Sequence, residues 1–127
     1  MSASQVIQTG NAPQAIGPYS QAVHSGSLVF LSGQVALDPE TMRLVEGGIV
    51  EQTEQVFDNL AAVAAAAGLS LDNAVRMTIY LTDLGNFKTV NEIMARRLDA
   101  PYPARVTIGV AALPANAIVE IDAILSD

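Results

Sequence analysis

The strongest structural signal in the chain lies in the stretch Ile49-Val-Glu-Gln-Thr-Glu-Gln-Val-Phe-Asp-Asn-Leu-Ala-Ala-Val-Ala-Ala-Ala-Ala67-Gly68. Its apolar side chains recur every three or four residues, which is the spacing of one face of an α-helix. Glycine is the residue that most readily ends a helix in the left-handed conformation, so Gly68 suits the carboxyl end. The stretch predicts a long helix from about Ile49, with a stripe of apolar side chains packed on a core: Ile49, Thr53, Val56, Phe57, Leu60, Val63, Ala64 and Ala67.

The segments on both sides of this helix have the pattern of strands. Three short β-prone runs precede it, at about residues 5–9, 19–24 and 28–32, and the last two could form a hairpin. After it, residues 75–81 alternate between apolar and polar. A second helix is expected at about residues 86–98, with an apolar stripe of Phe87, Val90, Met94 and Leu98, and strands at 105–112 and 118–125 close the chain. This order indicates an α+β sandwich, a mostly antiparallel sheet with two helices on one face.

The composition of the chain limits the number of domains, the partners and the location that we expect for the protein. A chain of 127 residues with no linker-like stretch predicts a single domain over residues 1–127. Half of its residues are hydrophobic and only 15% are charged, which favours self-association. The net charge of −7 opposes binding to nucleic acid and to anionic membranes. Residues 1–10 have neither a basic region nor a long apolar run, so we expect no signal peptide or anchor and a cytoplasmic location.

The residue inventory is poor in the usual catalytic groups. Without cysteine, the chain has no disulfide, thiolate nucleophile or zinc–thiolate site. His24 is the only histidine and Lys88 the only lysine, and each is interpreted as an ordinary strand or surface residue. No phosphate-binding glycine motif and no Gly-x-Ser-x-Gly elbow occurs. The usual catalytic motifs are therefore mostly absent from the sequence.

Polar residues at the edges of apolar strands remain as candidates for a site. Among them Arg105 follows Pro101-Tyr102-Pro103-Ala104 and opens an apolar strand. Its guanidinium suits a carboxylate gripped through two hydrogen bonds, either on a small ligand or on a structural acid such as Glu120 or Asp122. A cross-strand ion pair between Arg105 and Glu120 is thus an alternative. The full candidate set is Tyr19, Ser32, Asn91, Arg105, Thr107 and Glu120.

Five segments, in order along nearly the whole chain, closely resemble the RidA/YjgF family of reactive intermediate deaminases. They are Asn11-Ala-Pro-Gln-Ala-Ile-Gly17-Pro18-Tyr19-Ser-Gln21-Ala, Leu31-Ser32-Gly33-Gln34, Asp83-Leu84 with Phe87-Lys-Thr-Val-Asn91, Tyr102-Pro103-Ala104-Arg105 and Val119-Glu120-Ile121-Asp122-Ala123. The resemblance implies a homotrimer with a chorismate-mutase-like fold, whose sheets line an inner barrel and whose sites lie between subunits. It also implies hydrolysis of 2-imino acids or their enamine tautomers, such as 2-aminoacrylate, 2-iminobutanoate and 2-iminopropanoate, to 2-keto acids and ammonia, without a cofactor.

The resemblance also assigns roles to individual residues. Arg105 matches the arginine that binds the substrate carboxylate, and Glu120 matches the acid that positions or activates water. Tyr19, Ser32 and Asn91 match residues that line the cleft, and Thr107 stands where many members have cysteine. The segment from Asn91 to Arg105 is about three residues shorter than in well-known members, so we expect a second helix clipped by about one turn.

Two other classes of function stay open beside the deaminase. A trimer with the same arginine could bind small acids without catalysis, or act as a scaffold or holdase. Ribonuclease activity coupled to translation inhibition is a further reading, opposed by the acidic charge and by the absence of an aromatic and basic patch.

Overall fold

The computed structural model describes residues 5–127 and confirms the expected order of three strands, a helix, a strand, a helix and two strands. The expectation for the amino terminus falls partly on residues 1–4, which lie outside the described residues. Three short 3-10 turns join the elements: η1 (Leu71–Asn73), η2 (Leu84–Asn86) and η3 (Pro114–Asn116). The main elements are β1 (Gln5–Ile7), β2 (Ala22–Ser25), β3 (Leu28–Gln34), α1 (Ile49–Ala66), β4 (Ala74–Leu81), α2 (Phe87–Arg97), β5 (Ala104–Gly109) and β6 (Val119–Ser126).

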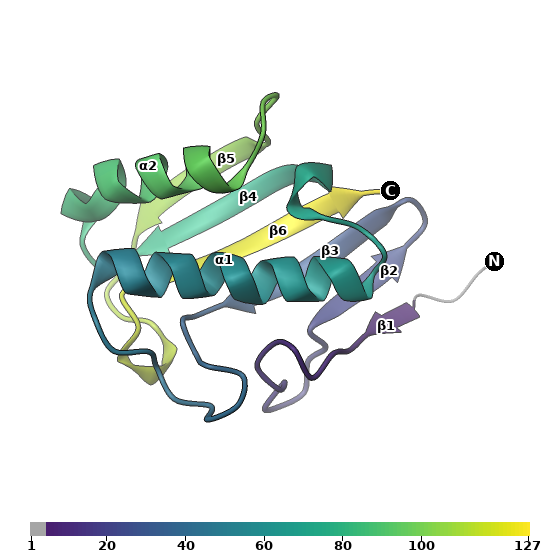
Figure 1. The fold of residues 1–127 in the computed structure, drawn as a ribbon, viewed down its shortest axis with the longest axis horizontal. Helices are drawn as coiled ribbons and strands as arrows, with labels where there is room; N and C mark the ends of the chain where they lie inside the picture. The colour runs from purple at the N-terminus through teal and green to yellow at the C-terminus, as the bar shows by residue number, and fades with distance from the viewer. Residues whose placement is uncertain (1–4) are drawn as a thin grey trace.

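The strands form one six-stranded sheet in the order β1-β2-β3-β6-β4-β5. Every neighbouring pair is antiparallel except β4 and β5, which are parallel because α2 carries the chain back between them. The crossover leaves β5 at the edge of the sheet and β6 near its middle (Figure 1). Since β4 separates β5 from β6, the alternative of a cross-strand pair between Arg105 and Glu120 is wrong.

Both helices cover the same face of the sheet, as predicted (Figure 1). The alternation along β6 shows how the sequence divides the two faces: Val119, Ile121 and Leu125 are fully buried under the helices. Between them Glu120 and Asp122 point to the opposite face, which we call the open face. Apolar side chains are also exposed on the open face, among them Phe30 at 43% and Ile108 at 41%.

Helix α1 matches its predicted stripe, with Val56, Phe57, Leu60 and Val63 completely buried. It ends at Ala66, and Gly68 follows with a φ of +77°, which is the left-handed conformation expected of it. No helix in the described part of the chain is long and apolar enough to cross a membrane.

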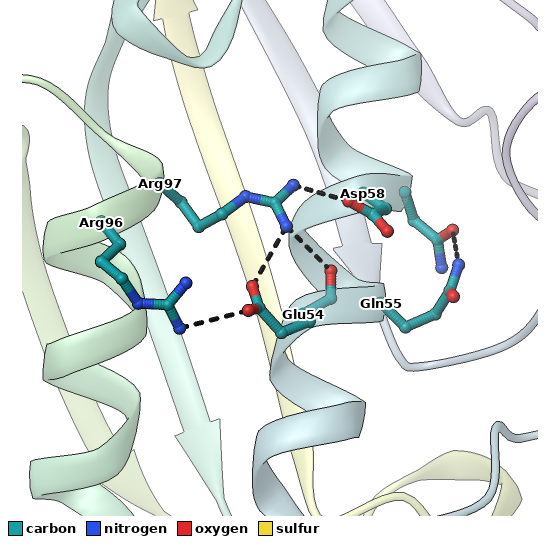
Figure 2. A network of polar contacts seen from close by, with 6 residues as sticks. Glu54, Gln55, Asp58, Arg96 and Arg97 are labelled. Carbon is teal, nitrogen blue, oxygen red and sulfur yellow. Dashed lines mark hydrogen bonds and ion pairs between the residues drawn. The ribbon is translucent and has the colours of Figure 1, made fainter.

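A polar network joins α1 to α2 on the outer surface of the helix layer (Figure 2). The Arg97 guanidinium donates to Glu54 Oε1 at 3.1 Å and to Asp58 Oδ1 at 2.7 Å, and it lies 5.7 Å from the centre of the Phe57 ring. Arg96 donates to Glu54 Oε2 at 3.2 Å. The network fixes the distance of α2 from α1, and thereby the place of the α2 residues that face β5.

The second predicted strand is shorter than expected and lacks Tyr19. Gly17 has a φ of +114° and the Tyr19 amide donates to the Gly17 carbonyl, so the chain turns here before β2 begins at Ala22. The buried Gln21 side chain holds this loop by bonding both the amide and the carbonyl of Thr9. Tyr19 is therefore presented on a loop and not on the sheet.

Candidate active site

Arg105 lies on the edge strand β5, on the face that carries the helices. Its backbone partner on β4 is the buried Met77, and partners in neighbouring strands share a face. The guanidinium donates to the Asn91 side-chain oxygen and lies 5.1 Å from the centre of the Phe87 ring. Phe87 and Asn91 are four residues apart on α2 and so occupy one side of that helix. Two residues of α2 thus hold the guanidinium in one place.

The charge of Arg105 has no acidic partner among residues 5–127, where the ion pairs involve other residues. It faces a hollow of about 400 Å³, lined by Asn91, Met94, Ala95, Tyr102, Pro103 and Arg105. The lining is mainly apolar apart from Asn91 and Arg105. A hollow with one fixed cation and apolar walls suits a small organic acid.

Thr107 lies two residues beyond Arg105, on the same face of β5. Its hydroxyl is buried and has no hydrogen-bond partner among the described residues. A buried hydroxyl without a partner is uncommon, because its desolvation is not offset. Thr107 therefore supplies a free donor near the arginine.

Glu120 lies on the open face, opposite Tyr80 of β4. Its carboxylate folds over Gly33 of β3 so closely that a Cβ on Gly33 would lie 2.4 Å from Glu120 Oε2. Burial, and next the charge of Asp122, raises the pKa of Glu120 above its usual value. The arrangement keeps a proton-accepting group poised at the sheet surface.

Ser32 precedes Gly33 on β3, and Tyr19 lies on the loop before β2. The Ser32 hydroxyl donates to the Ser20 carbonyl at 2.5 Å, which connects β3 to the loop that carries Tyr19. Tyr19 is 51% exposed and lines a second hollow, of about 600 Å³, together with Ser20 and Gln21. Its hydroxyl accepts a hydrogen bond from the Ile16 amide at 3.3 Å.

Arg105 and Glu120, the two charged candidates, therefore lie on opposite faces of one sheet. We call Phe87, Asn91, Arg105 and Thr107 the arginine cluster, and Ser32, Gly33 and Glu120 the glutamate cluster. Tyr19 lies on the loop that Ser32 contacts through the Ser20 carbonyl. Within one chain the structure brings Arg105 and Asn91 together but does not bring either to Glu120. A small substrate cannot touch both clusters of the same chain through the sheet.

Sequence reasoning missed Phe87 as a site residue by assigning it to the apolar stripe of the second helix. In the structure Phe87 is 39% exposed and stacks on Arg105, while Val90, Ile93 and Met94 form the buried stripe. The available signal was its spacing of four residues from Asn91, itself a candidate. Among residues 5–127 no group of three or more histidine, cysteine, aspartate or glutamate residues could hold a metal ion.

The mixed sheet with two helices on one face defines an α+β protein with the chorismate-mutase-like fold. A family profile described as Endoribonuclease L-PSP matches residues 9–126. A mouse protein named 2-iminobutanoate/2-iminopropanoate deaminase is 48% identical over 94% of this chain and 89% of its own length. This chain belongs to the RidA/YjgF family.

Two solved structures are similar over almost their full length. RidA from the Antarctic bacterium Psychrobacter sp. has a TM-score of 0.94 at 50% identity, covering 97% of this chain and 99% of the other. TdcF of Escherichia coli, solved with bound serine, has a TM-score of 0.91 at 39% identity, covering 97% and 98%.

Proposed function

We propose that this protein hydrolyses short 2-imino acids, or their enamine tautomers, to 2-keto acids and ammonia. The observation that carries the proposal is the Arg105 guanidinium, held by Phe87 and Asn91 at the rim of a hollow and without an acidic partner among residues 5–127. A guanidinium fixed in this way offers its remaining donors to the carboxylate of a substrate. The deaminase name of the mouse relative and the serine bound to TdcF support a small amino-acid-like ligand.

Imine hydrolysis needs few catalytic side chains, which agrees with the small number of such side chains in this protein. The carbon of a protonated C=N bond is already electrophilic, so water can attack it without a covalent nucleophile. Attack forms a C–O bond and leaves a tetrahedral carbon that bears a hydroxyl and an amino group. Proton transfer to that nitrogen then lets the C–N bond break, which releases ammonia as the C=O bond forms.

Two clusters supply the two things that the reaction needs. Arg105 orients the imine carbon by gripping the neighbouring carboxylate, and Thr107 is a further donor toward it. Glu120 holds the attacking water and relays its proton toward the leaving nitrogen. A positioned proton-transfer group of this kind typically contributes a factor of roughly 10² to 10⁴ to the rate.

Because Arg105 and Glu120 point to opposite faces of one sheet, each site combines the arginine cluster of one subunit with the glutamate cluster of its neighbour. A cyclic homotrimer provides three such sites. The exposed apolar side chains of the open face, such as Phe30 and Ile108, support burial against other subunits. We place the protein in the cytoplasm, with no nucleic-acid or membrane partner.

The test generates 2-iminobutanoate and 2-iminopropanoate in situ with an amino acid oxidase and follows keto acid release with and without the protein. Both Arg105→Ala and Arg105→Lys are expected to lose most of the acceleration, because lysine cannot form the paired hydrogen bonds. A near-normal rate in the alanine variant would remove Arg105 from the mechanism. Tight binding of 2-ketobutyrate without any acceleration would identify a receptor instead of an enzyme.

A further inference from the structure

We propose that Asp122, anchored by Tyr80, is a positioning residue that sets the proton affinity of Glu120 for proton transfer during imine hydrolysis. The proposal rests on the function proposed above and adds two residues to it. Neither Tyr80 nor Asp122 touches the substrate in this scheme, since both act through the Glu120 carboxylate.

The geometry of the open face places these groups side by side. Glu120 and Asp122 are two residues apart on β6 and leave the same face of the sheet. On the neighbouring strand β4, Tyr80 is the backbone partner of Glu120 and Thr78 that of Asp122. The Tyr80 hydroxyl crosses diagonally and donates to Asp122 Oδ2 at 2.9 Å. Asp122 is thereby fixed beside Glu120.

The two carboxylates have different surroundings. Asp122 accepts the tyrosine hydrogen bond, and the same bond raises the pKa of Tyr80, as expected for a phenol that donates to a carboxylate. Glu120 is half-buried against Gly33, and no hydrogen bond contributes to the raised pKa that burial and the Asp122 charge produce. Pairs of acids whose environments differ in this way divide the roles of fixed charge and proton carrier.

Tyr80, the partner of Glu120 on β4, also titrates, but its raised pKa keeps it uncharged near neutral pH. The adjacent part of β3 presents Ser32 and Gly33, neither of which titrates. On β4 the nearest cation, Arg76, is the backbone partner of Ile124, beyond Asp122, and forms no ion pair among the described residues. The field at Glu120 from its own chain is therefore dominated by the negative charge of Asp122.

A carboxylate that binds its proton more tightly is a stronger base toward the attacking water. It also retains the proton long enough to hand it to the leaving nitrogen. Removing the Asp122 charge should weaken Glu120 in both roles while leaving the grip of Arg105 on the substrate carboxylate unchanged. The turnover number should fall and KM should stay near its original value.

The experiment follows the Glu120 side-chain carboxyl by ¹³C NMR as a function of pH, with the signal assigned by its loss in Glu120→Gln. In Asp122→Asn, which keeps an oxygen able to accept from Tyr80, the Glu120 titration should move to lower pH. Asp122→Glu retains the charge and should restore the titration toward that of the original protein. Glu46→Gln is the control for net charge, because Glu46 is exposed in the loop before α1.

The same variants are then compared for imine hydrolysis across pH. Asp122→Asn should lower kcat about threefold near neutral pH and move the pH profile in the same direction as the NMR titration. An unmoved Glu120 titration in Asp122→Asn, or an equal movement in Glu46→Gln, would overturn the proposal whatever the activity. If the unmodified protein hydrolyses no imine, the proposed function fails, while the NMR result still decides whether Asp122 controls Glu120.

Discussion

Gly33 shows how one residue sets the geometry of the glutamate cluster. The Glu120 carboxylate occupies the volume that a side chain at position 33 would need. Gly33 has no left-handed φ, so its backbone conformation is open to other residues. Glycine is required at this position because a larger side chain would displace the Glu120 carboxylate, and not because of its backbone conformation.

Gly33→Ala should therefore impair turnover more than folding. Its Cβ would lie 2.4 Å from Glu120 Oε2, so the carboxylate must move away from its present position. We expect kcat for imine hydrolysis to fall on the order of tenfold, as for a displaced proton-transfer group. Gly10→Ala is the matched control, since nothing lies within 4 Å of its added Cβ. Equal kinetics in the two variants would contradict this placement of Glu120.

The raised pKa of Glu120 also makes a prediction about stability. The folded protein holds this proton more tightly than the unfolded chain, whose reference value is 4.5. Ionising Glu120 therefore costs folding free energy, and the cost appears as the pH rises from 4.5 through the folded pKa. Glu120→Gln should be more stable than the original protein at pH 7, and the difference should vanish below pH 4.5.

Urea unfolding at a series of pH values measures this difference directly. A difference that stays constant between pH 4 and pH 8 would show that the stability effect does not come from the ionisation of Glu120. A gain in stability on removing a group that serves in catalysis, as we propose for Glu120, is a common trade-off at functional sites.

Helix α2 has two separate tasks at the scale of elements. One side binds α1 through Arg96 and Arg97 (Figure 2), and the other presents Phe87 and Asn91 to Arg105. A helix of 11 residues with a mostly polar composition depends on such tertiary contacts to stay folded. The ion pairs on α1 therefore support the geometry of the site from a distance.

Arg96 and Arg97 make a matched test of that support. The Arg97 side chain is 25% exposed, contacts Glu54 and Asp58 and packs on Phe57. The Arg96 side chain is 61% exposed and has Glu54 as its one acidic partner among residues 5–127. Arg97→Ala should lower the free energy of unfolding by about 1–2 kcal/mol, through lost packing as well as lost charge. Arg96→Ala should cost less than about 0.5 kcal/mol. Equal costs in urea unfolding would show that α2 does not depend on the Arg97 contacts.

Elements with a clear period were predictable from the sequence, and the exceptions have physical reasons. The stripe of α1 and the alternation of β6 follow from burial of one face, so both were predicted correctly. The beginning of the second strand was predicted incorrectly, because the turn at Gly17 and the hydrogen bonds of Gln21 override the local preference. Phe87 was misassigned because periodicity does not distinguish a ring packed in the core from one stacked on a guanidinium.

The order of the strands in the sheet could not be predicted from local sequence patterns. That β6 lies between β3 and β4 depends on pairing across more than 90 residues of sequence, from Leu28 to Ser126. Arg105 and Glu120 are separated because β4 lies between β5 and β6 and because the two side chains leave opposite faces of the sheet. The candidate residues could be chosen from the sequence and from family resemblance, while their division between two faces required the structure.

At the scale of the whole molecule, this division bears on the proposed function, which requires more than one subunit for a complete site. If Arg105 and Glu120 of different subunits meet in one site, two inactive variants can complement each other. A subunit with Arg105→Ala still supplies Glu120, and a subunit with Glu120→Gln still supplies Arg105. A mixed trimer of the two contains sites in which both residues are intact.

Refolding the two variants together at equal amounts should restore about one quarter of the original activity, because random assembly pairs the two intact residues at about one interface in four. Each variant refolded alone is the control and should stay inactive. A mixture no more active than its components would contradict a site shared between subunits. Sedimentation of the refolded mixture confirms that assembly has taken place.

The placement of Arg105 and Glu120 on opposite faces of the sheet also predicts how the protein behaves on dilution. If the proposed site is shared between subunits, a single folded subunit is inactive, because its Arg105 and Glu120 point to opposite faces of the sheet. Dilution should then abolish turnover before any secondary structure is lost. Specific activity should rise again when the protein is concentrated and the subunits reassemble. The total activity would then depend on the fraction of subunits that have assembled, and not only on the amount of protein present.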